Sequence, residues 1–93
     1  MKSLFVAVVA TVGVSFAGAA LAQADVAQKN CGTCHAVDTK KMGPSFKDIA
    51  AKYKGNASAE ADLVAKLKSG KGHPAIKLSD SELTGVVKWV LSQ

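Results

Sequence analysis

The chain has 93 residues, 48% of them hydrophobic, and carries twelve basic residues against seven acidic ones, for a formal net charge of +5. This length accommodates one domain, and a mild basic excess without any block of like charges gives little support to nucleic-acid binding. Chains this short barely offset their conformational entropy with one apolar core, so a further stabilising element is expected.

The N-terminal segment has the three-part layout of a secretory signal peptide. Lys2 supplies the positive charge, residues 4–17 form an apolar run, and Ala20-Leu21-Ala22 supplies the small residues of a cleavage site. The alternative is a transmembrane anchor, which needs about 20 apolar residues. We predict that residues 1–22 are the signal peptide and that residues 23–93 form the exported, periplasmic domain without a membrane span. A cut two residues later also satisfies the pattern.

A short helix around Val26 and Ala27 is expected to lead into the pentapeptide Cys31-Gly32-Thr33-Cys34-His35. Cys-x-x-Cys-His is the attachment signal of a c-type haem. Two thiols at this spacing can each form a thioether on one side of the haem, and the imidazole that follows can reach the iron. The sequence therefore predicts one covalent haem c, with Cys31 and Cys34 as tethers and His35 as an axial iron ligand. A buried haem is also the stabilising element that so short a domain needs.

Two other chemistries use the same residue types. Cys31, Cys34, His35 and His73 match the number of ligands in a structural zinc site, but adjacent Cys34 and His35 are poorly placed to share a tetrahedral ion. A thioredoxin-like Cys-x-x-Cys expects a βαβ context, which the helical spacing of this chain does not provide. Both alternatives are weaker than haem attachment.

Three further segments carry apolar side chains at helical spacing, and none reads convincingly as a strand. Gly55 and Gly70 end the first two, Ser58 is a candidate N-cap of the second, and Ser79-Asp80-Ser81-Glu82 is a capping box that begins the last. The predicted fold class is all-α, with about four short helices. The three segments are residues 45–54, with Phe46, Ile49, Ala50 and Tyr53 on one face; 58–69, with Leu63, Val64 and Leu67; and 79–91, with Leu83, Val86, Val87, Val90 and Leu91.

These residues resemble a small bacterial class I cytochrome c of the cytochrome c-551 type. The matching segments are Cys31 to Lys40, Gly43 to Ala50 and Lys88 to Gln93, and the resemblance covers essentially all of residues 23–93. It implies the small class I fold, with its short helices wrapped around one covalently bound haem, and a function in electron transfer.

The resemblance also assigns two neighbours of the haem. It implies that the Pro44 carbonyl accepts a hydrogen bond from His35 Nδ1–H, a contact that orients a ligating imidazole and raises its basicity. It places Trp89 in the last helix, packed near the haem, where an indole N–H can find a partner. Trp89 as plain core is the other interpretation.

The chain departs from the family at the second axial ligand. Members present Met followed by Pro in the loop before the last helix, and this chain has His73-Pro74 there. Because an imidazole binds low-spin iron as well as a thioether does, we expect His73 to ligate the iron opposite His35. Two alternatives stay open: Met42, the only methionine in residues 23–93, as the ligand, or a five-coordinate iron with His73 in solvent.

The sequence thus predicts a periplasmic monohaem cytochrome that carries single electrons between redox protein partners and is not an enzyme. The alternatives are a haem protein that binds or senses carbon monoxide or nitric oxide, and a haem subunit of a larger redox enzyme. Monomers and small oligomers are both compatible with the sequence. Phe46, Ile49, Leu67, Ile76, Val87 and Leu91 are expected to shield the iron, and Lys29, Lys40, Lys41, Lys71 and Lys77 are candidates to surround the haem edge and steer acidic partners, or else form a solvated face.

Overall fold

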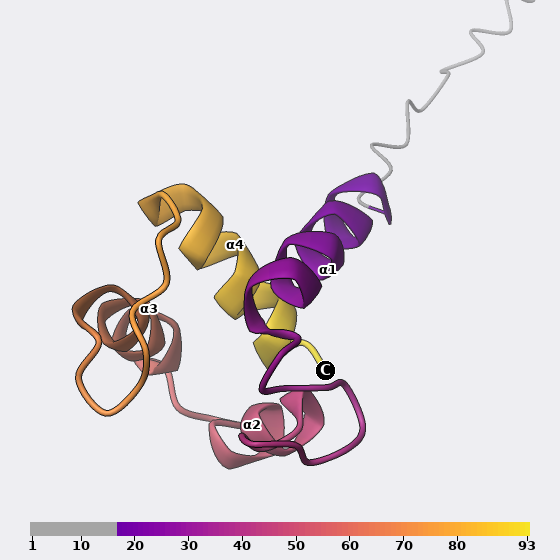
Figure 1. Ribbon diagram of the computed structural model, residues 1–93, viewed down its shortest axis with the longest axis horizontal. Helices are drawn as coiled ribbons and strands as arrows, with labels where there is room; N and C mark the ends of the chain where they lie inside the picture. Colours follow the sequence, from indigo (N-terminus) through magenta and orange to yellow (C-terminus); the bar gives the residue numbers. More distant parts are fainter. Residues whose placement is uncertain (1–16) are drawn as a thin grey trace, which may run out of the picture.

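The computed structural model describes residues 17–93, and these residues form four helices (Figure 1). The helices are α1 (Ala17–Cys31), α2 (Phe46–Lys52), α3 (Ala59–Ser69) and α4 (Asp80–Leu91). Within this part of the chain no strand is present, only an isolated backbone bridge between His35 and Lys40. The all-α prediction is confirmed. Lys2 and nearly all of the predicted apolar signal segment lie outside the described residues.

No helix within residues 17–93 combines the length and the hydrophobicity that a membrane span requires.

Helix α4 is the centre of the fold and packs against each of the other three helices (Figure 1). Its apolar residues recur at helical spacing, so one face is buried. Burial of an aliphatic side chain stabilises a fold by about 1.5–3 kcal/mol, so this face holds the domain together. The buried residues of α4 are Leu83, Val86, Val87 and Val90.

Helix α1 packs on α4 through small residues. Ala27 is fully buried and shares a core cluster with Phe46, Val86 and Val90. Gly85 lies under the Gln23 side chain, where a Cβ on Gly85 would stand only 2.5 Å from Gln23 Nε2. Glycine at this point therefore leaves room for the Gln23 side chain on the surface of α4.

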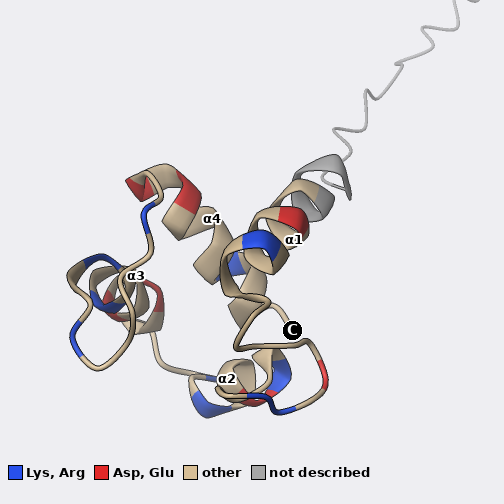
Figure 2. Ribbon diagram, viewed as in Figure 1, with Lys and Arg blue, Asp and Glu red and all other residues tan. Residues whose placement is uncertain are grey.

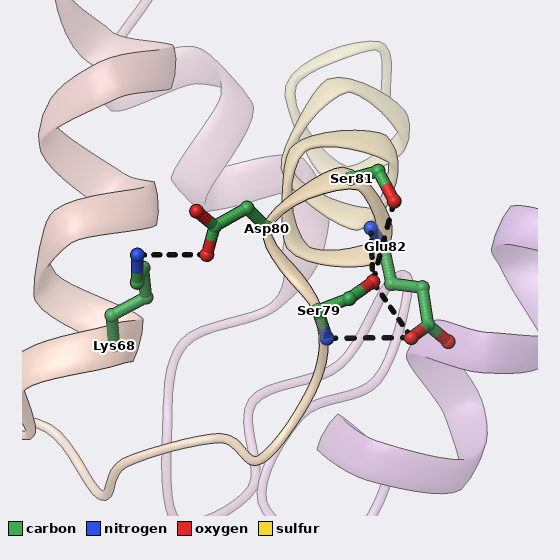
Figure 3. Close-up of polar contacts among 5 residues, drawn as sticks. All are labelled: Lys68, Ser79, Asp80, Ser81 and Glu82. Atoms are coloured by element: carbon green, nitrogen blue, oxygen red, sulfur yellow. Dashed lines mark hydrogen bonds and ion pairs between the residues drawn. The ribbon is translucent and has the colours of Figure 1, made fainter.

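The start of α4 is fixed by the predicted capping box (Figure 3). Ser79 Oγ accepts a hydrogen bond from the Glu82 amide at 3.2 Å, and Glu82 Oε1 accepts one from the Ser79 amide at 3.3 Å. Lys68 Nζ, from α3, lies 2.7 Å from Asp80 Oδ1. Exposed ion pairs contribute only about 0–1 kcal/mol, but this one joins the two ends of the loop between α3 and α4.

The helices α2 and α3 begin differently. Ser45 Oγ accepts a hydrogen bond from the Asp48 amide at 3.1 Å, so Ser45 caps α2. The prediction that Ser58 caps α3 is wrong in its chemistry: Ser58 occupies the cap position, but its hydroxyl makes no capping bond and lies 2.9 Å from Asn56 Oδ1. The cause is the Ser58 backbone, which has a ψ of 0° instead of the extended conformation that aims a side chain at the free amides.

Candidate functional site

A cavity of about 440 Å³ lies among the four helices, and it receives side chains from each of them. This volume falls within the range of about 300–1,000 Å³ typical of ligand and cofactor sites. The end of α1 and the turn after it contribute Cys31 and His35, and the loop between α3 and α4 contributes His73. The apolar wall comes from Phe46 and Ile49 of α2, Leu63 and Leu67 of α3, and Val86, Val87 and Val90 of α4.

The Cys-x-x-Cys-His segment forms a tight turn at the C-terminal end of α1. The Cys31 carbonyl accepts hydrogen bonds from the amides of Cys34 at 3.2 Å and His35 at 3.0 Å. Both thiols are half-buried and are not joined in a disulfide. Cys31 lines the cavity, whereas Cys34 is not among the lining residues. Burial raises the pKa of the Cys31 thiol, and the neighbouring Cys34 adds to the rise, so Cys31 stays protonated at neutral pH.

The His35 ring is held in a fixed orientation. Its Nδ1 lies 2.6 Å from the Pro44 carbonyl oxygen, so the Nδ1–H tautomer donates there and leaves Nε2 free as an acceptor or metal ligand. Gly43 lies directly against the imidazole, where any Cβ would collide with the ring. The Gly43 amide in turn donates to the Cys34 carbonyl at 2.8 Å. The segment 43–44 therefore supports the imidazole from behind.

His73 faces His35 across the cavity. The two rings have centroids 6.1 Å apart and planes only 10° from parallel. Two imidazole–metal bonds of about 2.0 Å each, extended by the ring radius on either side, give a separation of about 6 Å. The observed centroid separation therefore matches that of two imidazoles bound to one metal ion. His73 Nδ1 lies 2.7 Å from the Pro74 carbonyl oxygen, which favours a free Nε2 on this ring also.

The donor set and the walls fit the haem that the pentapeptide predicts. Two imidazoles face each other, a cysteine stands at the rim, and the wall between them is mostly aliphatic and aromatic. The zinc alternative finds no support, because no group of three or more His, Cys, Asp or Glu side chains in residues 17–93 converges to hold a metal ion.

Several residues that the sequence analysis considered for the site do not line the cavity. The Met42 side chain is 83% exposed and does not line the cavity. Trp89 also lies outside the wall, where its ring meets Phe46 edge-on with centroids 5.3 Å apart, behind a residue that does line it. Ile76 and Leu91, expected in the apolar shell, are not among the lining residues. Met42 and Ile76 lie in loops, whose course sets their positions, and Trp89 and Leu91 lie in α4, whose rotation sets theirs.

Four polar lining residues were missed by the sequence analysis as site residues. Asp48, Lys52, Tyr53 and Lys66 place polar groups on the otherwise mostly apolar wall. A usable signal was present: Lys52 follows Ile49 by three positions and Lys66 follows Leu63 by three, so each lysine shares the inward face of its helix. Lysines commonly bury their stems and keep the ammonium group in water, as these positions allow.

Comparisons with known proteins agree on one family. A family model described as cytochrome c matches residues 17–93. Cytochrome c-551 of Pseudomonas aeruginosa is 46% identical over 72 residues, which cover 70% of this chain and 69% of the relative. Cytochrome c-552 of Nitrosomonas europaea is 37% identical over 101 residues, covering 99% and 98%.

Solved structures show the same relationship. The crystal structure of the class 1 cytochrome MtoD from Sideroxydans lithotrophicus ES-1 has a TM-score of 0.70 and 37% identity, and the match covers 82% of this chain and 94% of that one. Wild-type Nitrosomonas europaea cytochrome c552 has a TM-score of 0.65 and 37% identity, covering 74% and 96%.

Proposed function

Because the chain belongs to the cytochrome c family, we propose that it is an exported electron carrier whose haem iron has two histidine ligands. Members of this family transfer single electrons and bind one covalent haem c through a Cys-x-x-Cys-His motif. Haem supplies the one-electron chemistry, and the protein supplies the axial ligands, the exclusion of water and the access for partners. We propose no substrate chemistry for the chain itself.

The observation that carries the proposal is the opposition of His35 and His73. Their centroid separation of 6.1 Å matches two imidazoles on one iron, and both axial positions would then be filled by the protein. A site with both axial positions taken in either redox state suits a carrier, because no bond has to form or break when the electron moves. A sensor needs a vacant or labile position instead. The 83% exposure of Met42 supports His73 over Met42 as the proposed ligand.

We propose that Cys31 and Cys34 form the two thioethers. The turn holds both cysteines on one short segment, and His35 directly follows Cys34 at the end of that segment. The two tethers and the proximal ligand are therefore fixed together. Lys52 and Lys66 are proposed to face anionic carboxylates at the cavity rim, such as the haem propionates, since charge-assisted hydrogen bonds to carboxylates are among the stronger polar contacts.

We propose that the chain is exported to the periplasm and cleaved after Ala22, not after Ala24. Helix α1 runs without a break across both candidate positions. Cleavage after Ala22 retains Gln23, whose side chain lies against Gly85 at the contact between α1 and α4. Cleavage after Ala24 removes that cover from α4.

Redox partners with acidic surfaces suit the distribution of lysines. Figure 2 shows lysines on the segment before α2 and on the connection from α3 to α4. Lys29 pairs with Asp25 at 3.1 Å and is therefore a weaker candidate for steering. The other four candidates have no carboxylate partner within residues 17–93, and charge complementarity of this kind mainly raises association rates. They are Lys40, Lys41, Lys71 and Lys77.

Carbon monoxide binding to the reduced protein tests the proposal. We expect a low-spin ferrous spectrum at pH 7 and slow or negligible binding, because the proposed His73 ligand would occupy the sixth position. The His73→Ala variant should bind carbon monoxide rapidly and serves as the control for access. A high-spin wild-type spectrum with rapid binding would instead support the alternative of a protein that binds or senses small ligands.

A further inference from the structure

The Lys41 side chain contacts the Cys-x-x-Cys-His motif, although Lys41 lies outside it in the sequence. Its Nζ donates a hydrogen bond to the Gly32 carbonyl oxygen at 2.9 Å. Gly32 is the residue directly after Cys31 in Cys-x-x-Cys-His. A positive charge is therefore anchored to the backbone between the two cysteines, in addition to any role in steering partners.

The ammonium group lies at the end of a helix that favours it. Gly32 follows the last residue of α1, so its carbonyl belongs to the C-terminal end of that helix. This end carries partial negative charge and unpaired carbonyls, which lysine side chains satisfy. This interaction favours one position of the Lys41 side chain although the side chain is exposed to solvent.

The backbone around Lys41 is tied to the same motif, which limits the freedom of the ammonium group. The Lys41 amide donates to the Gly43 carbonyl at 3.0 Å, and the Gly43 amide donates to the Cys34 carbonyl at 2.8 Å. The Lys41 side chain is therefore bonded to Gly32 in the motif, and the loop that carries Lys41 is bonded to Cys34.

The charge of Lys41 is not neutralised by a neighbouring carboxylate. Asp38, the nearest acidic residue along the chain, is paired with Lys47 at 2.5 Å. No ion pair of Lys41 occurs among residues 17–93, where the pairs are Lys29 with Asp25, Lys47 with Asp38, Lys68 with Asp80 and Lys88 with Glu60.

We propose that Lys41 is a positioning residue that also raises the reduction potential of the site. When a redox partner donates one electron, the charge of the site falls by one unit and no bond forms or breaks. A fixed cation beside the motif lowers the free energy of that reduced state relative to the oxidised one. This inference rests on the proposed attachment at Cys31 and Cys34.

The experiment compares midpoint potentials of the haem-loaded protein in three variants. Lys41→Gln removes the anchored charge, and Lys40→Gln is the matched control, since it removes the same charge from the neighbouring exposed residue, for which no side-chain bond occurs in the described chain. Lys41→Arg keeps the charge. We expect Lys41→Gln to shift the equilibrium between the reduced and oxidised protein about threefold toward the oxidised form. At 59 mV per tenfold, this lowers the midpoint potential by about 28 mV. Lys40→Gln should shift it less than half as far, and Lys41→Arg should stay near wild type.

Equal shifts for Lys41→Gln and Lys40→Gln, or no shift in either, would overturn the proposal. If Lys41→Gln fails to assemble, Lys41→Met retains the aliphatic stem and tests the charge alone. Loss of haem in both, with Lys41→Arg intact, would reduce Lys41 to a structural clamp and also reject the effect on potential. A wild-type protein without covalent haem would contradict the proposed attachment itself, so the two failures are distinguishable.

Discussion

The imidazole rings of His35 and His73 face each other with centroids 6.1 Å apart, but the protein supports them unequally. His35 is braced by the Pro44 carbonyl and by close contact with Gly43. His73 lies in a loop, and its Nδ1 lies 2.7 Å from the carbonyl oxygen of its own neighbour, Pro74. Any exchange of ligand at the iron should therefore begin on the His73 side.

Replacing His73 with methionine should raise the reduction potential, because Met/His ligation raises the potential of c-type cytochromes. A redox titration of His73→Met against wild type measures the change. A sulfur-to-iron charge-transfer band at the red end of the oxidised spectrum should appear only in the variant. An unchanged potential without that band would argue against His73 as the ligand, and the same band in wild type would point to Met42.

The haem of the wild-type protein should resist extraction by acidified acetone, because thioethers survive this treatment. The double variant Cys31→Ala, Cys34→Ala should yield an unfolded or proteolysed chain, since the remaining core is too small to stand alone. Extraction followed by absorption spectroscopy, with circular dichroism of the variant, measures both outcomes. Release of haem from wild type would reject the covalent attachment.

Gly43→Ala should disturb the proximal ligand, because a Cβ at this position collides with the His35 imidazole. We expect a loss of about 1–3 kcal/mol in the free energy of unfolding, as for other overpacked sites, together with a changed visible spectrum. Gly55→Ala is the control. Gly55 has a φ of 79° with open space around it, so the loss there reflects backbone strain alone and the spectrum should stay unchanged.

Intact-mass measurement of the secreted protein should give the mass of residues 23–93 plus one haem, because Gln23 completes the contact with Gly85. N-terminal sequencing supplies an independent reading of the same cut. A mature chain that begins at Asp25 would contradict the preferred cleavage position while leaving export intact.

Ser79→Ala should loosen the loop that carries His73, since it removes the cap at the start of α4. Loss of an N-cap costs about 1 kcal/mol, which corresponds to about a fivefold rise in local opening if the loop and the cap open together. Carbon monoxide association with the ferrous protein should accelerate accordingly. Ser58→Ala is the matched control, because the Ser58 hydroxyl makes no capping bond. Equal rates in the two variants would mean that release of His73 does not involve the cap.

The sequence predicted the helices well because their signals are local. Apolar spacing and the Ser79 to Glu82 box depend on residues within a few positions of one another, and the structure contains both. The Ser58 cap failed because a hydroxyl caps only from an extended backbone, which residue type does not guarantee. Ser45, with a ψ of 155°, meets that condition.

The lining of the site was less predictable, because it depends on how helices rotate and pack at long range. The family resemblance placed Trp89 near the haem, but its ring meets Phe46 edge-on and does not line the cavity. Lys52 and Lys66 were not predicted as lining residues, although their spacing from Ile49 and Leu63 places them on inward faces. The opposition of His35 and His73 depends on the course of a Gly- and Pro-containing loop, which no periodic pattern describes.

The contact between α1 and α4 also sets a time order for assembly. Ala27 is buried against Val86 and Val90, which lie far along the chain, so the core cannot close until α4 has crossed the inner membrane, given the proposed export. Until then α1 lacks its main packing partner, and short isolated helices are marginal in water. Cys31 and Cys34 therefore remain reachable during translocation, which gives the attachment reaction an interval before folding encloses the site.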